Sequence, residues 1–209
     1  MEERVINDES CLAEGASYLS SVSVELAEAI ALVGPLSLHR SPDGFGRLLS
    51  AIVSQQLSVA AASSIWNRLK KSGLTGPRKI SWASDQDLAK SGLSRQKIRY
   101  ARALAESGVN YKALRKMKTE EVIERLTRVS GIGNWTAEIY TMFSLGRADV
   151  FAPGDLALQE AARMLFRFER RPNEKEFREM SLVWSPWRSV AARILWAYYR
   201  LMKERDGVR

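Results

Sequence analysis

The sequence is poor in the residues that most metal and redox sites require. Its 209 residues include one cysteine, Cys11, and one histidine, His39. A single cysteine allows no disulfide within the chain and no cluster held by four cysteines, and it suits a reducing compartment. One histidine leaves little from which to build a classical zinc site or a Ser/His/Asp triad.

Long apolar runs are also missing. The apolar stretches are far shorter than the roughly 20 residues that a membrane-spanning helix needs, so we expect no membrane partner. Residues 1–10, MEERVINDES, are acidic and polar. Because a secretory signal peptide needs a basic segment followed by an apolar one, these residues predict no signal peptide.

Negative charge is in deficit. The chain has 32 Lys and Arg against 24 Asp and Glu, a formal net charge of +8, and its pI is about 9.8. A compact protein this basic favours anionic partners, and nucleic acid is the first of these. A ribosomal or membrane-surface protein would share this charge, so the charge alone selects no function.

Apolar residues recur at helical spacing along almost the whole chain, and no segment alternates as a strand does. The pattern predicts one helix over 20–33 and two helices within 45–71 that meet at the polar turn Gln55-Gln56. Further helices are predicted over 134–145 and 156–168. Capping or helix-starting residues are predicted at Ser84, Ser94, Thr119, Asn173 and Pro186. The predicted fold class is all-α.

Ser130-Gly131-Ile132-Gly133 is a tight hairpin between two predicted helices. Glycine permits a left-handed backbone and lets another chain approach closely. The amides that open the following helix, together with the helix dipole, favour an anion such as a DNA phosphate. The alternative is a helix–turn–helix corner that serves packing alone.

Four ordered segments resemble one known family. The stretch 126–137, LTRVSGIGNWTA, with 150–156, VFAPGDL, is similar to the helix-hairpin-helix motif, Gly/Pro-rich loop and aspartate of the HhH-GPD DNA glycosylase superfamily. Three segments resemble its 3-methyladenine glycosylase II, or AlkA-like, branch: 52–58, IVSQQLS; 131–137, GIGNWTA; and Pro186-Trp187-Arg188-Ser189 before Leu195-Trp196. The resemblance covers 45–198.

Asp155 is the candidate catalytic residue. By position it can be the N-cap of the next helix, which is the purely structural interpretation. The resemblance assigns it a second role beside the deoxyribose C1′. A carboxylate there stabilises the oxocarbenium-like sugar that forms when an N-glycosidic bond breaks, and it can orient or deprotonate the attacking water.

The residue at position 135 predicts the outcome of the reaction. Bifunctional relatives carry a lysine two residues after the second hairpin glycine, and its amine attacks C1′ and leads to strand cleavage. Here that residue is Trp135. The resemblance therefore implies a monofunctional hydrolase of N-glycosyl bonds that leaves an intact abasic strand. Without four cysteines, the iron–sulfur cluster of some relatives is excluded.

The aromatic residues suggest the lesion. By resemblance, Trp135 and Trp196 line the pocket for a flipped base, with Trp187, Phe45 and Tyr140 as weaker candidates. An electron-rich pocket suits a cationic base such as 3-methyladenine or 7-methylguanine, because each cation–π contact contributes roughly 0.5–2 kcal/mol. Alkylation also makes the base a better leaving group.

The resemblance also implies a set of DNA contacts. They are Gln55, Gln56 and Leu57 in the turn and Gly131, Ile132, Gly133, Asn134 and Thr136 in the hairpin. Gln56 or Leu57 is expected to fill the gap left by the flipped nucleotide, and the alternative is a polar interruption with Leu57 in the core. Candidate phosphate contacts are Arg95, Lys97, Arg99, Arg102, Arg128 and Arg188.

The resemblance implies no required cofactor. It adds one structural cation, Na⁺ or K⁺, bound by backbone carbonyls. By position these belong to Thr127, Val129 and Ile132.

We expect one glycosylase unit over 1–209 with two helical lobes. The middle lobe is 40–148, with the hairpin near 119–146, and 1–39 packs with 149–209. The hairpin and Asp155 are expected at the cleft between the lobes. The expected partner is double-stranded DNA with damaged bases, bound by a monomer in the cytoplasm at the nucleoid of a prokaryote, or otherwise in a nucleus.

Two alternatives remain from the sequence. One is a glycosylase for another damaged base, such as an oxidised or deaminated purine. The other is a non-catalytic helix-hairpin-helix DNA-binding protein, which would need neither Asp155 nor an aromatic pocket.

Overall fold

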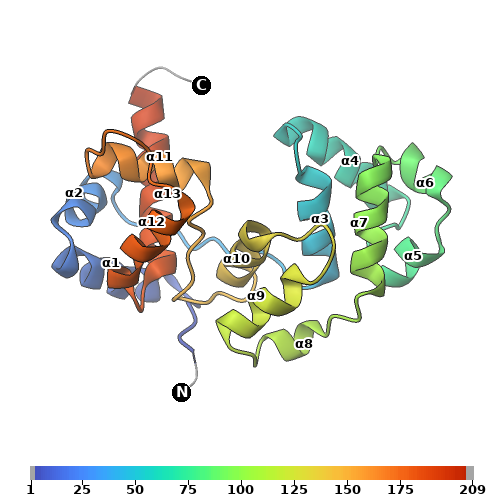
Figure 1. Ribbon diagram of the computed structural model, residues 1–209, viewed down its shortest axis with the longest axis horizontal. Helices are drawn as coiled ribbons and strands as arrows, with labels where there is room; N and C mark the ends of the chain where they lie inside the picture. The colour runs from blue at the N-terminus through green and yellow to red at the C-terminus, as the bar shows by residue number, and fades with distance from the viewer. Residues whose placement is uncertain (1–2, 206–209) are drawn as a thin grey trace. The chain divides into compact units, whose positions relative to one another are not determined.

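The computed structural model describes residues 3–205, and within that range it is helical, with one isolated β-bridge and no strand (Figure 1). The all-α prediction is confirmed. The chain forms two compact units, Met1–Arg40 with Thr141–Arg209 as the first and Ser41–Tyr140 as the second.

The second unit is built around one long helix. Its members are α3 (Phe45–Ser54), α4 (Val59–Lys71), α5 (Pro77–Trp82), α6 (Asp85–Lys90), α7 (Arg95–Glu106), α8 (Tyr111–Leu114), α9 (Thr119–Thr127) and most of α10 (Asn134–Phe143). Helix α7 packs against α3, α5 and α6, as Figure 1 shows. Its apolar face, Ile98, Ala101 and Leu104, is buried, whereas most of its other residues are polar or charged. Burial of that face holds the unit together.

The first unit is centred on α13. Its members are α1 (Glu9–Val22), α2 (Val24–Val33), α11 (Leu156–Leu165), α12 (Glu174–Met180), the 3-10 helix η1 (Ser181–Trp184) and α13 (Arg188–Arg205). Helix α13 contacts α1, α2 and α11, and is buried over most of its first three turns. Helix α1 comes close because Gly15 has no side chain: a Cβ there would lie 2.7 Å from Val190 Cγ2.

The structure confirms three predicted caps. The side chains of Ser84, Ser94 and Asn173 accept from the backbone N–H three residues onward, at 3.1, 3.3 and 3.0 Å. The turn expected at Gln55-Gln56 is also present, between α3 and α4. Short-range signals of this kind need no knowledge of the tertiary structure.

Several predicted boundaries were wrong. The helix over 20–33 is broken at Ser23, which caps α2 through Leu26 N. Helix α9 has Lys118 rather than Thr119 at its N-cap, and the Glu121 carboxylate accepts from the Lys118 amide. Helix α13 begins at Arg188, two residues after Pro186.

The helix predicted over 156–168 ends at Leu165, because Arg167 takes a left-handed φ of 57°. Residues 141–148, expected in the middle lobe, cluster with the first unit instead. Backbone bonds tie them there, from Ile6 N to Gly146 O and from Ala148 N to Arg4 O. Among residues 3–205, no helix has the length and apolar character needed to cross a membrane.

Candidate active site and nucleic-acid interface

The hairpin joins α9 to α10 within the second unit. Gly131 has a φ of +92°, and a Cβ at this position would lie 2.4 Å from Cγ of Tyr100. Ile132 is buried, and its N–H donates to Val129 O at 3.0 Å. Gly131 is therefore required twice over, by its backbone conformation and by the close approach of the Tyr100 ring on α7.

Gly133 differs from Gly131 in its surroundings. It is exposed, and a Cβ built on it would meet no atom within 4 Å. Its carbonyl accepts from Ala137 N at 3.1 Å, so α10 begins directly after it. The exposed Asn134 is the first residue of that helix. A helix start of this kind, with a glycine at its entrance, is suited to a phosphate.

Gln55 connects the turn between α3 and α4 to the hairpin, and Lys97 connects the same turn to α7. The amide of Gln55 donates from Nε2 to Gly131 O at 2.9 Å. The ammonium of Lys97 on α7 donates to Val53 O at 2.6 Å and to Gln55 O at 2.7 Å. These carbonyls lie at the C-terminal end of α3, where a cation is favoured, and burial lowers the pKa of Lys97. The turn is thus tied both to the hairpin and to α7.

The turn presents its middle residues to solvent. Gln56 has a left-handed φ of 57° and is exposed. Leu57 is 40% exposed and Val59 is 85% exposed. The alternative that Leu57 belongs to the core is therefore wrong, since this turn displays apolar side chains. Val59 was missed by sequence reasoning because a valine at helical spacing is ordinarily assigned to the core.

Helix α10 carries two of the predicted pocket residues, Trp135 and Tyr140, and they differ in exposure. Trp135 is 46% exposed, whereas Thr136 is buried. Tyr140 is 1% exposed; its hydroxyl donates to Asp43 and accepts from Gly44 N at 3.0 Å. Burial and the Asp43 hydrogen bond raise the pKa of Tyr140. Tyr140 is therefore a buried anchor between α10 and the start of α3, which does not fit a pocket wall.

Phe45, the first residue of α3, is also buried and belongs to the core of the second unit. Asp43, which no sequence motif singles out, is the centre of a small polar cluster here. Its carboxylate accepts from Tyr140 and pairs with Arg115 at 2.7 Å. Burial and the charge of Asp43 raise the pKa of Tyr111 to about 12.

Asp155 is the N-cap of α11 in the first unit. Its Oδ1 accepts from the amides of Ala157 and Leu158, each at 3.0 Å, and from the indole Nε1 of Trp196 at 3.2 Å. The side chain of Gln159 ties the preceding loop to α11 through Pro153 O at 2.8 Å. Three donors on one oxygen fix the position of the carboxylate.

Trp196 is a half-buried residue of α13 that lies beside Asp155. Its ring packs against Phe143 with ring centres 5.7 Å apart. The guanidinium of Arg193 lies over the other aromatic ring, 4.6 Å from the Phe143 centroid. Burial, with the like charge of Arg40, lowers the pKa of Arg193 to about 10. Beside the acid, the Trp196 ring thus contacts the Phe143 ring, and the Phe143 ring contacts the buried guanidinium of Arg193.

Trp187 does not join this group. It is 3% exposed and packs on Gly15 of α1, and the guanidinium of Arg4 lies 4.7 Å from its ring centroid. Its surroundings are those of a core residue of the first unit, so its assignment to the base pocket lacks structural support.

Most of the candidate phosphate contacts are engaged within the protein. Lys97 binds backbone carbonyls, and Arg102 binds Asp85 and the carbonyls of Ser81 and Ala83. The remaining pairs are Arg128 with Glu124 and Arg188 with Asp149. Of the six candidates, Arg95 and Arg99 alone have no side-chain partner among residues 3–205. The pairings of Lys97, Arg102 and Arg188 join segments that are distant in the sequence, so they could not be predicted from it.

No group of three or more His, Cys, Asp or Glu side chains in the described range could hold a metal ion. The backbone cation site is a different kind of site. The carbonyl of Val129 already accepts from Ile132 N, which leaves it one lone pair for a cation. That site remains a prediction.

Comparison with known proteins gives the family. The model of the HhH-GPD superfamily of base excision DNA repair proteins matches residues 49–187, more than half of the chain. The chain belongs to this superfamily. It is 30% identical over 210 residues to the Schizosaccharomyces pombe protein named DNA-3-methyladenine glycosylase 1, covering 95% of this chain and 92% of the relative.

Solved structures agree with this placement. A DNA-3-methyladenine glycosidase from Bacillus halodurans has a TM-score of 0.82 at 35% identity, covering 96% of this chain and 94% of that one. The S. pombe 3-methyladenine DNA glycosylase Mag1, in complex with abasic DNA, has a TM-score of 0.76 at 30% identity, covering 88% and 95%. The family resemblance read from the sequence is confirmed.

Proposed function

We propose that this protein is a monofunctional DNA glycosylase that removes alkylated bases, of the 3-methyladenine and 7-methylguanine type, by hydrolysing the N-glycosidic bond. The observation that carries the proposal is the carboxylate of Asp155, whose Oδ1 is held by two backbone amides and the Trp196 indole. Two similar proteins, matched over 92% and 94% of their own length, are named DNA-3-methyladenine glycosylase and DNA-3-methyladenine glycosidase.

Asp155 supplies the chemistry in this proposal. As the bond between C1′ and the base nitrogen lengthens, the electron pair leaves with the base and the sugar becomes positively charged. The fixed carboxylate stabilises that charge without having to reorganise. Water then forms the new bond to C1′, and its proton passes to the carboxylate or to solvent. The product is an abasic site in an intact strand.

Two tryptophans and the absence of a lysine at position 135 support this choice of substrate and reaction. A base that is already cationic leaves easily and needs little acid catalysis, and it is attracted to electron-rich rings. Trp196 stands next to Asp155, and Trp135 is exposed at the start of α10. Residue 135 is not a lysine, so no amine is available there to form the Schiff base that leads to strand scission.

DNA contact is assigned to the hairpin and the turn. The open helix start after Gly133 receives a backbone phosphate, and this contact positions the protein without reading sequence. The turn from Gln55 to Leu57 supports the strand from which the nucleotide is flipped, with Gln56 or Leu57 entering the gap. We further propose that a monomer carries out the reaction without a cofactor, at the nucleoid or in a nucleus, with Na⁺ or K⁺ on the hairpin carbonyls.

The test is release of bases from methylated duplex DNA, measured by chromatography, with strand integrity measured on a denaturing gel. We expect free 3-methyladenine and 7-methylguanine, and strand breaks only after heat or alkali. Asp155→Asn is the control that must lose this release. Bound DNA without release from a panel of alkylated, oxidised and deaminated lesions would instead identify a binding protein. Strand scission without heat or alkali would contradict a monofunctional enzyme.

A further inference from the structure

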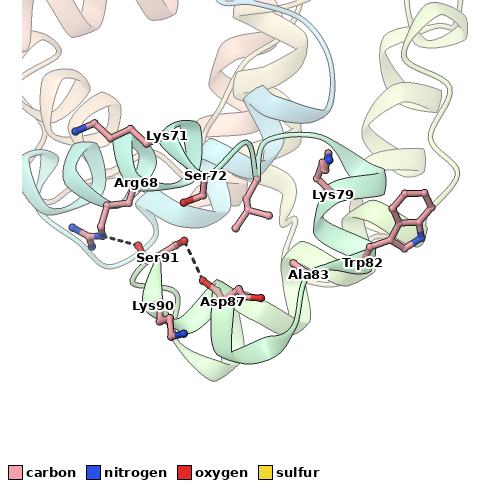
Figure 2. A pocket seen from close by; sticks show the side chains of 10 residues that line it. Arg68, Lys71, Ser72, Lys79, Trp82, Ala83, Asp87, Lys90 and Ser91 are labelled. Carbon is pink, nitrogen blue, oxygen red and sulfur yellow. Dashed lines mark hydrogen bonds between the residues drawn. The ribbon is translucent and has the colours of Figure 1, made fainter.

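A basic groove lies in the second unit, bordered by α4, α5 and α6 (Figure 2). It encloses about 660 Å³, and its lining includes Leu74 and Ala83 as well as the hydroxyl-bearing Ser72 and Ser91. It shares no residue with the hairpin, with the turn from Gln55 to Leu57 or with Asp155. The proposed excision reaction therefore gives this groove no role.

Four cationic side chains surround the groove. Arg68, Lys71, Lys79 and Lys90 come from three different helices or their ends, and Figure 2 shows them spread around the opening. Arg68 is engaged, because Nε donates to Ser91 O at 2.9 Å and Nη1 donates to Ser64 Oγ at 2.8 Å. The three lysine ammonium groups have no hydrogen bond or ion pair to any of residues 3–205.

The single acid of the groove does not balance these charges. The Asp87 carboxylate accepts a hydrogen bond from the Ser84 hydroxyl at 2.7 Å, in the cap of α6. Three lysine charges without a partner, beside one acid that is already hydrogen-bonded, give the groove a strong positive potential. Such a potential attracts an anionic partner and accelerates its association.

Trp82 adds an apolar element to the groove. It ends α5, is 79% exposed, and stands one helical turn after Lys79. Figure 2 shows its ring projecting outward at one end of the groove. Tryptophan carries a large apolar surface that folding normally removes from water, and it is enriched among the residues that dominate protein–protein binding.

We propose that this groove binds an extended acidic peptide segment of a partner protein. Its carboxylates pair with Lys71, Lys79 and Lys90, and a large apolar side chain of the peptide packs against Trp82 and Leu74. Recognition of this kind combines charged contacts at the rim with one apolar anchor. The inference goes beyond the proposed glycosylase function, since no residue of the groove takes part in the proposed excision reaction.

The lining favours a peptide over nucleic acid. Phosphates are recognised best by the forked guanidinium of arginine, and the only arginine of the groove is already held by Ser91 and Ser64. A duplex presents phosphates and sugars on its outer surface, with no apolar side chain for Leu74 and Ala83. An extended peptide supplies both carboxylates and an apolar side chain.

The test uses fluorescence anisotropy with a labelled peptide of four aspartates followed by leucine and phenylalanine. We expect saturable binding with a Kd of about 1–100 μM, weakened by salt. Trp82→Ala and the double variant Lys79→Gln/Lys90→Gln should each weaken binding at least about tenfold, because each removes one of the two kinds of contact. The control is Lys112→Gln/Lys116→Gln, two exposed lysines of the same unit outside the groove.

Three competition arms complete the experiment. A peptide of six aspartates should bind more weakly than the probe, and a twelve-nucleotide poly-dT strand and a twelve-base-pair duplex should not displace the probe at equal concentration. Excision of methylated bases should stay within about twofold of the parent in every groove variant. Equal binding of the probe by parent and groove variants would overturn the proposal. Displacement by DNA together with slower excision would assign the groove to DNA instead.

Discussion

Two helix starts carry the proposed function, and they are built in opposite ways. Helix α10 opens at Gly133, where no side chain covers the backbone and a Cβ would meet nothing within 4 Å. Helix α11 opens at Asp155, whose carboxylate accepts the amides of Ala157 and Leu158. One start leaves room for an anion from outside, and the other already holds an anion of its own.

The difference shows how one physical effect serves two purposes. The positive end of a helix favours negative charge in both cases. At α10 that charge is to be supplied by a DNA phosphate, so binding depends on the open space beside Gly133. At α11 the charge belongs to the protein, and the helix fixes its position while Trp196 adds a third donor. The acid is thus held by the ordinary energetics of a helix cap.

The largest effect is expected where the charge is removed without loss of the cap. Asparagine caps helices about as well as aspartate, so Asp155→Asn should change the free energy of unfolding by less than about 1 kcal/mol. Excision should fall about 10²- to 10⁴-fold, since the amide cannot stabilise a cationic sugar or accept a proton. Single-turnover base release and urea unfolding measure the two quantities separately.

The matched control is Asp8→Asn, which makes the same change at the N-cap of α1, where Asp8 accepts from Cys11 N at 3.0 Å. It should leave excision unchanged. Retention of full activity by Asp155→Asn would mean that this residue is a structural cap and nothing more.

The two hairpin glycines should give opposite results on substitution. Gly131→Ala puts a methyl group against Tyr100 at a left-handed φ, and should destabilise the protein by about 2–4 kcal/mol. Gly133→Ala should cost less than about 1 kcal/mol, because nothing lies nearby. It should instead weaken DNA binding, since its methyl group enters the space of the phosphate. Thermal unfolding and DNA anisotropy separate the two, and equal losses of stability would refute the distinction.

The predictable parts of this molecule are local in sequence. Ser84, Ser94 and Asn173 could be identified as caps because the partner amide lies three residues away. The hairpin was recognisable for the same reason, since its two glycines and flanking helices fall within one short stretch. Asp155 as the start of α11 also follows from its neighbours alone.

What could not be predicted depends on pairing between distant segments. Lys97 looks like a surface cation on an amphipathic helix, but its ammonium reaches carbonyls 42 and 44 residues away. Tyr140 and Trp187 look like pocket aromatics, but their burial depends on Asp43 and on α1 respectively. Helical periodicity identifies a buried face without identifying what covers it.

Substitution of Trp196 tests how far a residue outside α11 helps to position Asp155. Trp196→Phe keeps a ring against Phe143 but removes the donor to Asp155. A hydrogen bond to a charged group contributes about 1.5–3 kcal/mol, so the excision rate should fall roughly 10- to 100-fold. Trp66→Phe is the control, because Trp66 forms no side-chain hydrogen bond among residues 3–205. Equal rates in the two variants would show that α11 positions the acid alone.

The loop before Asp155 depends on an ion pair that titrates. Burial alone would raise the pKa of Asp149, but hydrogen bonds from Arg188 and Ser185 lower it below its ordinary value. Because the pKa is lower in the folded state, the ionised carboxylate stabilises the fold at pH values above the unfolded-state pKa of about 3.9. This stabilisation is lost as the pH falls through the folded-state pKa. Asp149→Asn should therefore cost about 1–2 kcal/mol at pH 7 and less at pH 3. Unfolding at both pH values measures this, and a pH-independent cost would contradict it.

The smallest effect is expected at Lys97. It concerns the start of α10, where DNA is expected to bind, and leaves the start of α11 unchanged. The hairpin is held from outside, by Gln55 and by the helix that carries Lys97 and Tyr100. Lys97→Met should release the turn from α7 and raise the KM for damaged DNA about three- to tenfold, with kcat unchanged, because Asp155 is not involved. Lys97→Arg should restore much of the binding. Lys70→Met, a change at an exposed lysine of the same unit, is the control. A fall in kcat without a change in KM would show that the turn acts in the chemical step instead of in holding DNA.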